Sequence, residues 1–121
     1  MWPTRLSRKQ EQGRQWEDAA LAYLGRHGLV LVEANFRCKL GEIDLILRDG
    51  ATLVFVEVRQ RAAGAQVSAA ASIGASKIRR IIRAAQVYLQ RLDRLPPCRI
   101  DVVAIDGDNV EWLRNAIEAG V

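Results

Sequence analysis

The chain has 121 residues, of which 50% are hydrophobic and 26% are charged, and its formal net charge is +4. This length fits a single domain with one hydrophobic core, and the composition excludes a disordered chain. No apolar run is long enough to cross a bilayer, and the basic residues at the start lack the apolar segment of a signal peptide, so we expect a cytoplasmic protein that does not enter a membrane.

Cysteine and histidine are too few and too scattered to indicate a zinc site or a Cys–His nucleophile. The two cysteines, Cys38 and Cys98, lie far apart in the sequence, and neither belongs to a CxxC pair. The only histidine is His27. We therefore predict two free thiols in a reducing compartment.

The first half of the chain predicts one helix and three strands. Apolar residues recur at helical spacing from residue 8 to residue 27, and Gly28 is a natural stop for that helix. Residues 29–36 have the composition of a strand. Residues 41–48 and 51–59 predict a hairpin, because an Asp-Gly pair separates two apolar runs.

The second half predicts a loop, a helix and a short strand pair. Residues 62–75 are rich in Ala, Ser and Gly and predict a flexible loop that lies next to the hairpin. Ser76 is placed to cap the next helix, which ends before two consecutive prolines. Residues 99–105 predict a strand, residues 109–113 a short final strand, and Arg114 the start of a brief closing helix.

These elements predict an α/β fold, in which a mixed sheet lies between helices in a small three-layer α/β sandwich. The predicted strands are apolar on both faces, so helices should cover both sides of the sheet. We expect residues 1–121 to form a single domain, in which residues 1–10 are largely a flexible basic tail.

The segment GEIDLILRDGATLVFVEVRQR, residues 41–61, carries two carboxylates among apolar neighbours. If Asp49-Gly50 is a two-residue loop, alternation of side chains places all the charged residues on one face. These residues are Glu42, Asp44, Glu57 and Arg59. The opposite face is then wholly apolar: Ile43, Leu45, Leu47, Val54, Val56 and Val58. In this register Asp44 and Glu57 are diagonal neighbours, roughly 7–8 Å apart.

Two carboxylates on one face repel each other, unless one is protonated or a cation lies between them. An all-oxygen ligand set favours Mg²⁺, Mn²⁺ or Ca²⁺. Arg59 follows Glu57 on the same face, where it can grip a phosphate, so the group fits metal-dependent phosphodiester hydrolysis. The alternative is a structural salt bridge between Asp44 or Glu57 and a basic residue.

A series of motifs covers the chain from about residue 12 to residue 105. They are Gly13, Glu17-Asp18-x-Ala20, Asn35-Phe36-Arg37, GEIDLI, FVEVR, Lys77 and RIDVVAI. Their order resembles the PD-(D/E)XK nuclease pattern and, more narrowly, the YraN family of predicted bacterial endonucleases, which are related to archaeal Holliday-junction resolvases. The resemblance implies a restriction-endonuclease-like core of order α-β-β-β-α-β-β and an Mg²⁺-dependent or Mn²⁺-dependent endonuclease that acts on DNA.

The resemblance also implies roles for individual residues. Asp44 and Glu57 match the metal-binding carboxylates, the Val58 carbonyl would be a backbone ligand, and Glu17 matches the helix-borne catalytic acid. Arg59 occupies the catalytic position at which the superfamily has lysine. Because arginine keeps the charge but does not readily give up a proton, the alternative function is a non-catalytic nucleic-acid-binding protein with the nuclease fold.

Basic residues outside this site are expected to contact nucleic-acid phosphates. They are Arg37, Lys39, Arg61, Lys77, Arg80 and Arg83. For the residues in the second helix, the alternative is a solvated face. A resolvase-like role would imply a homodimer, although the sequence carries no dimer signature.

Overall fold

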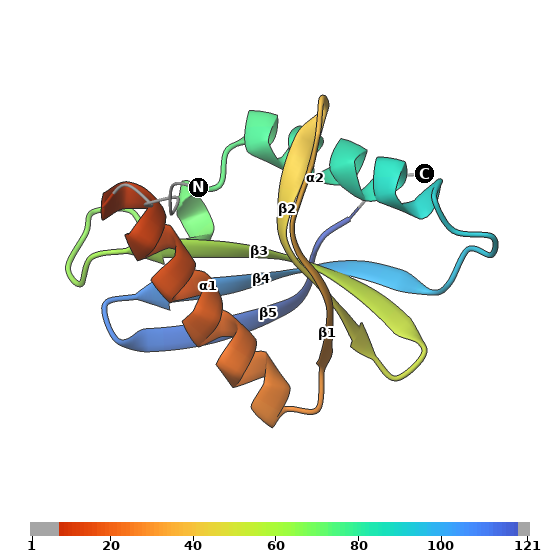
Figure 1. Cartoon of the computed structure of the whole chain (residues 1–121). Coiled ribbons are helices and arrows are strands. Elements are labelled where there is room, and N and C mark those ends of the chain that lie inside the picture. The colour runs from red at the N-terminus through yellow and green to blue at the C-terminus, as the bar shows by residue number, and fades with distance from the viewer. Residues whose placement is uncertain (1–7, 119–121) are drawn as a thin grey trace, which may run out of the picture.

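A mixed five-stranded sheet lies between two long helices in the computed structural model, which describes residues 8–118 (Figure 1). The elements in chain order are α1 (Arg8–Arg26), β1 (Val30–Cys38), β2 (Gly41–Asp49), β3 (Thr52–Arg61), the 3₁₀ helix η1 (Ala70–Ser72), α2 (Ala75–Leu89), β4 (Cys98–Asp106) and β5 (Asn109–Ile117). The predicted fold class and element order are therefore confirmed. None of the helices in the described part of the chain is long and apolar enough to cross a membrane.

The strands lie in the order β1-β2-β3-β4-β5, and each neighbouring pair is antiparallel except β3 with β4. A parallel pair needs a crossover connection, which α2 provides. Since α2 returns the chain over one face of the sheet, the opposite face is left for α1 (Figure 1).

Each face of the sheet has its own hydrophobic cluster. On the α1 side, Ala20 and Leu24 pack among side chains of β2, β3 and β4. On the α2 side, Ile81 and Tyr88 pack around Phe55 at the centre of the sheet. This two-sided burial explains why the central strands are apolar at nearly every position.

The β2–β3 hairpin turns one residue later than predicted. Asp49 pairs with Thr52, so the two-residue loop is Gly50-Ala51, and Gly50 adopts φ +61°, which glycine accepts without strain. Because the loop is still even, the predicted division of faces holds along the paired part of the hairpin. The register is shifted by two residues, however, and the paired ladder ends at Leu45–Val56, one residue short of both Asp44 and Glu57.

Beyond Leu45–Val56, the last pair of the β2–β3 ladder, β2 leaves β3 but stays paired with β1. The two strands continue as an arm that lies against α2 (Figure 1). Ile43 in this arm packs in the α2-side cluster, so its predicted place on the face of Leu45 and Leu47 is wrong. Strict alternation fails here because the arm twists away from the sheet.

Two predictions of local structure are wrong. Ser76 does not cap α2, because the helix begins two residues earlier than predicted and its N-cap position is Gly74, with no side-chain cap. The closing helix expected from Arg114 is the second half of β5, which runs to Ile117 after a register shift in its ladder with β4.

The buried Asp101 explains that shift. Its carboxylate accepts hydrogen bonds from Arg99 Nε (3.0 Å), Trp112 Nε1 (2.9 Å) and the backbone N–H of Asn115 (2.8 Å), and Asn115 has a left-handed φ of 50°. A buried charge with this many donors is satisfied in place. The role of Asp101 is therefore to join β4 to β5.

Residues 62–75 make specific contacts in this structure. The N–H of Ala69 donates to Asp106 Oδ1 at 2.8 Å, and Ala69 is buried. These contacts place the segment against β3 and β4, while its flexibility stays a prediction. Residues 1–7 of the predicted basic tail lie outside the described residues, and 8–10 belong to α1.

Candidate functional site

Asp44 lies at the point where β2 separates from β3. The backbone N–H of Val58 donates to Asp44 Oδ2 at 2.8 Å, so a side chain replaces the ladder partner that β2 no longer provides. In a strand the carbonyl of a residue points to the same side as its N–H. The Val58 carbonyl therefore also points toward the space around Asp44.

Glu57 lies on β3, lines the same cavity as Asp44 and is only 3% exposed. Its Oε2 atom is buried and accepts no hydrogen bond from any residue that the structure describes. The Lys77 ammonium lies 3.9 Å from this atom, which is within range of an ion pair but too far for a hydrogen bond. Glu57 is thus a buried acid with incomplete compensation.

Three carboxyls in this region have raised pKa values. Burial raises the pKa of Glu57 to about 8, and the neighbouring Asp44 carboxylate adds to this effect. Burial also raises the pKa of Asp44, while the hydrogen bond from Val58 opposes the rise. Burial and the Asp44 charge raise the pKa of Glu17 to about 7. A cluster of acids that resist ionisation is a common feature of functional sites.

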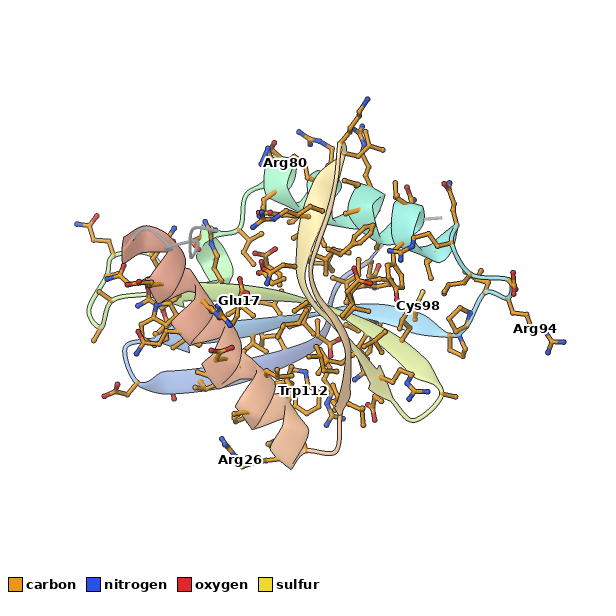
Figure 2. All side chains as sticks on the ribbon, viewed as in Figure 1. Glu17, Arg26, Arg80, Arg94, Cys98 and Trp112 are labelled. Atoms are coloured by element: carbon orange, nitrogen blue, oxygen red, sulfur yellow. The ribbon has the colours of Figure 1, made fainter. Side chains whose placement is uncertain are left out.

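These acids share a cavity of about 320 Å³ between α1 and the end of β3. Glu17 projects from α1 toward the sheet (Figure 2), and it lines this cavity with Asp44, Glu57, Val58 and Arg59. The structure therefore brings together all of the catalytic and metal-binding residues that the sequence predicted. Their roles in catalysis stay predictions.

Arg59 lines the cavity but is engaged elsewhere. Its Nε donates to Ser72 Oγ at 2.9 Å and its guanidinium also contacts the Ser72 carbonyl at 3.4 Å, so it holds the segment around η1 against β3. Lys77 of α2, predicted only to contact phosphates, is the cation that lies beside Glu57. The sequence carried a signal for this placement, because Lys77 continues the buried stripe of Ile81, Ala84 and Tyr88 at helical spacing.

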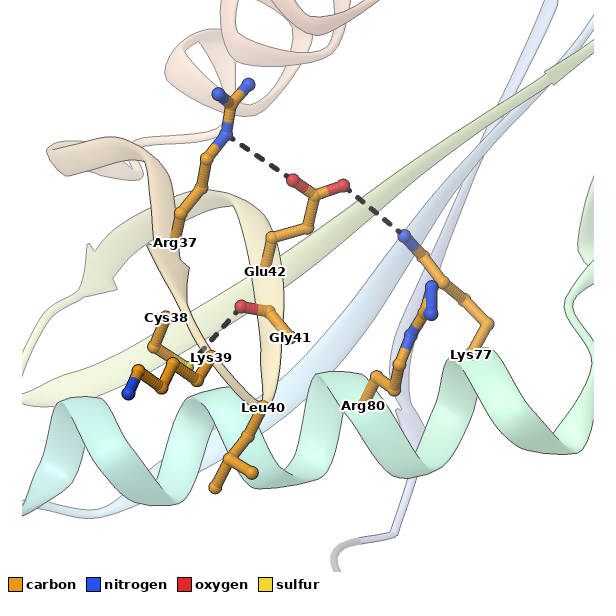
Figure 3. A pocket seen from close by; sticks show the side chains of 8 residues that line it. All are labelled: Arg37, Cys38, Lys39, Leu40, Gly41, Glu42, Lys77 and Arg80. Carbon is orange, nitrogen blue, oxygen red and sulfur yellow. Dashed lines mark hydrogen bonds and ion pairs between the residues drawn. The ribbon is translucent and has the colours of Figure 1, made fainter.

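A second cavity, of about 250 Å³, lies between the β1–β2 arm and α2 (Figure 3). Four of the six predicted nucleic-acid contacts line it: Arg37, Lys39, Lys77 and Arg80. Arg61 lines the first cavity instead, and Arg83 is exposed on α2 and lines neither.

Lys77 and Glu42 connect the two cavities. Glu42 Oε2 lies 3.4 Å from Arg37 Nε, and its Oε1 lies 3.8 Å from the ammonium of Lys77 (Figure 3), which in turn lies 3.9 Å from Glu57. This series of charges alternates in sign from the exposed arm to the buried acid. Glu42 therefore forms ion pairs with Arg37 and Lys77 at the start of β2.

Whether these residues fit a divalent ion depends on their donor atoms. The carboxylates of Asp44 and Glu57 and the Val58 carbonyl offer oxygen alone, which Mg²⁺ and Mn²⁺ prefer. The buried Glu57 Oε2, which accepts no hydrogen bond, is a donor atom of this kind. Among the described residues, no group of three or more His, Cys, Asp and Glu side chains is arranged to hold a metal. The fit thus rests on two carboxylates and a backbone oxygen, with water or a phosphate for the other positions.

The fold and the site define a small α/β protein with a pair of acids, the half-buried Asp44 and the buried Glu57, at one end of a mixed sheet. The chain belongs to the uncharacterised protein family UPF0102, whose model matches residues 16–105. It is similar to the UPF0102 protein of Cupriavidus metallidurans (62% identity, covering 90% of this chain and 82% of the relative). It is also similar to those of Janthinobacterium sp. strain Marseille (58%, covering 92% and 90%) and Herminiimonas arsenicoxydans (53%, covering 97% and 98%). The activity expected from the nuclease resemblance stays a prediction, because these names state none.

Proposed function

We propose that the protein is a divalent-metal-dependent endonuclease that hydrolyses phosphodiester bonds in DNA. The observation that carries this proposal is the pair of Asp44 and Glu57. Their carboxyls line one cavity, both have raised pKa values, and the Lys77 ammonium is too distant to hydrogen-bond the buried oxygen of Glu57. A divalent cation between the carboxyls would favour their ionised forms.

Asp44, Glu57 and the Val58 carbonyl would hold Mg²⁺ or Mn²⁺. When bound, such an ion lowers the pKa of water and neutralises charge on a phosphoryl oxygen. In the net reaction, a water oxygen forms a bond to phosphorus and the bond to the leaving sugar oxygen breaks. The water loses a proton and the leaving oxygen gains one. Glu17, with a pKa of about 7, exchanges protons readily near neutral pH and lines the same cavity, which suits an acid–base group for this step.

The cavity beside the arm supports nucleic acid as the substrate. Its cations, Arg37, Lys39 and Arg80, are exposed, and Lys77 joins this cavity to the carboxylates. A nucleic-acid strand whose phosphates follow these cations would reach Asp44 and Glu57. Phosphate contacts of this kind position the substrate without reading its sequence.

A cleavage assay tests the proposal. The purified chain is incubated with single-stranded, duplex and branched DNA and with RNA, in Mg²⁺, Mn²⁺ or EDTA. We expect metal-dependent cleavage of DNA that Asp44→Asn and Glu57→Gln each reduce by at least about 100-fold. Asp108→Asn, at an exposed turn, is the matched control for loss of one acid. Cleavage that survives both substitutions would place the activity elsewhere.

A second candidate is a nucleic-acid-binding protein without catalysis. It is favoured by the engagement of Arg59 with Ser72, which takes the residue at the usual lysine position away from the acids. DNA binding by the wild type without cleavage of any substrate in either metal would establish this candidate and refute the first.

A further inference from the structure

We infer that Lys77 is the catalytic cation of this site and that Arg59 instead anchors the segment around η1. The inference rests on the proposed nuclease function, and it assigns the cation that assists the reaction to α2 instead of β3. The sequence motif places this charge on β3, two residues after Glu57, whereas the structure places a lysine from α2 beside the acids.

The position of Lys77 favours a role at the reacting phosphate. Its side chain is 24% exposed, and its ammonium lies 3.8 Å from Glu42 and 3.9 Å from Glu57. A charge-assisted hydrogen bond from an ammonium to a carboxylate is about 2.7–2.9 Å long, so neither of these ion pairs is a hydrogen bond. At these longer distances the ammonium retains its N–H donors for a further acceptor, and a phosphoryl oxygen is one that matches its charge.

The backbone fixes this position. Gly41 of the arm lies so close to α2 that a Cβ atom there would collide with the carbonyl oxygen of Arg80, so the arm and the helix are held together one turn from Lys77. Lys77 lies one turn before the buried Ile81 on the same side of α2. Its ammonium therefore lies over the sheet side of the helix, 3.9 Å from Glu57.

Arg59 lacks this freedom. Its Nε donates to Ser72 Oγ at 2.9 Å, while Ser72 Oγ donates to the Ala69 carbonyl at 2.7 Å, so Arg59 is part of the hydrogen-bond network that shapes η1. Ala69 is buried, and its backbone N–H donates a further hydrogen bond to Asp106 Oδ1. To reach a phosphate, the Arg59 side chain would have to give up its contacts with Ser72. Loss of Arg59 should therefore affect the segment around η1 first.

The consequence for the reaction is electrostatic. Hydrolysis places additional negative charge on the phosphoryl oxygens, and a fixed ammonium in a partly dry site stabilises that charge more in the transition state than in the bound substrate. Lys77 should therefore contribute to kcat more than to substrate affinity. Arg80, at the exposed edge of the neighbouring cavity, should contribute to affinity instead.

The test compares Lys77→Met, Lys77→Arg and Arg59→Met with Arg79→Met, an exposed neighbour in α2 that loses the same charge. Steady-state cleavage of DNA is measured in Mn²⁺, DNA affinity by fluorescence anisotropy in EDTA, and the thermal midpoint of each variant by circular dichroism. We expect Lys77→Met to lower kcat by about 100-fold, with DNA affinity within about threefold of wild type and the midpoint unchanged. Lys77→Arg should recover part of the rate.

Arg59→Met should lower the midpoint and reduce kcat by less than about 10-fold, and Arg79→Met should match wild type. The inference is overturned if Lys77→Met cuts as fast as wild type, or if its rate falls only in step with its affinity or midpoint. Loss of kcat in Arg59→Met at an unchanged midpoint would return the role to Arg59. A wild type that cuts nothing overturns the proposed function together with this inference, whereas an active Lys77→Met variant overturns this inference alone.

Discussion

Replacing Glu57 by glutamine should reduce the pH dependence of stability in the metal-free protein. Glu57 is 3% exposed, and burial together with the Asp44 charge raises its pKa from 4.5 to about 8. Glutamine keeps the size and the polar end of the side chain but cannot ionise. The substitution therefore isolates the cost of charging this one buried group.

The magnitude follows from the two pKa values. Each tenfold change in a proton-binding constant corresponds to about 1.4 kcal/mol, so ionising Glu57 in the fold costs up to roughly 5 kcal/mol. Between pH 4.5 and pH 8 the folded state binds more protons than the unfolded state, so the free energy of unfolding falls as pH rises through this window. Above pH 8 the loss is complete. Asp44 contributes with the same sign, because its pKa is also raised.

The assay is urea unfolding in EDTA at pH 5, 7 and 9. The wild type should lose stability over this range, whereas Glu57→Gln should resemble it at pH 5 and exceed it at pH 9 by about 2–5 kcal/mol. Glu111→Gln, which alters an exposed glutamate of β5, is the control and should follow the wild type. Parallel curves for wild type and Glu57→Gln would refute the reasoning, since Glu57 would then ionise in the fold without cost.

Three further predictions concern the metal, the arm and the buried acid of β4. Mn²⁺ should raise the thermal midpoint of the wild type but not of Asp44→Asn. Because the acids must lose protons to bind the metal, calorimetric titration should show tighter Mn²⁺ binding as pH rises from 6 to 8. Mn²⁺ binding that does not depend on pH would contradict this prediction. Gly41→Ala should lower the free energy of unfolding in urea by about 1–3 kcal/mol, because the new Cβ meets the backbone of α2. Gly25→Ala, in an open helical position, should raise it by about 0.5–1 kcal/mol. Equal effects of the two substitutions would argue against the close approach of Gly41 to α2. Asp101→Asn should lower the free energy of unfolding by about 3–5 kcal/mol, because it breaks a buried charge network. Asp108→Asn, at an exposed position, should lower it by less than about 0.5 kcal/mol. An Asp101→Asn variant as stable as the wild type would contradict the role of Asp101 in joining β4 to β5.

The hairpin shows which structural features local sequence can predict. Alternation of side chains and an even turn were sufficient to divide the faces of the paired residues from Leu45 to Val56, even though the turn itself lies at Gly50-Ala51. The face assignment survived because a shift of the turn by one residue at constant loop length moves the register by two. Ile43 departed from the pattern because β2 leaves the sheet after Leu45, and no local signal reports that departure.

The sequence by itself determined the α/β class and the element order and singled out Asp44 and Glu57 as carboxylates among apolar neighbours, because hydrophobic periodicity and the side-chain alternation of a strand are local properties. Only the tertiary structure decided which cation meets those acids. Arg59 is close to Glu57 in the chain yet turns to Ser72, while Lys77 reaches Glu57 from α2 across twenty residues of sequence. The physical reason is that the crossover between β3 and β4 brings the first turn of α2 over the end of β3, and a side-chain contact between two elements depends on how they pack rather than on their separation in the chain.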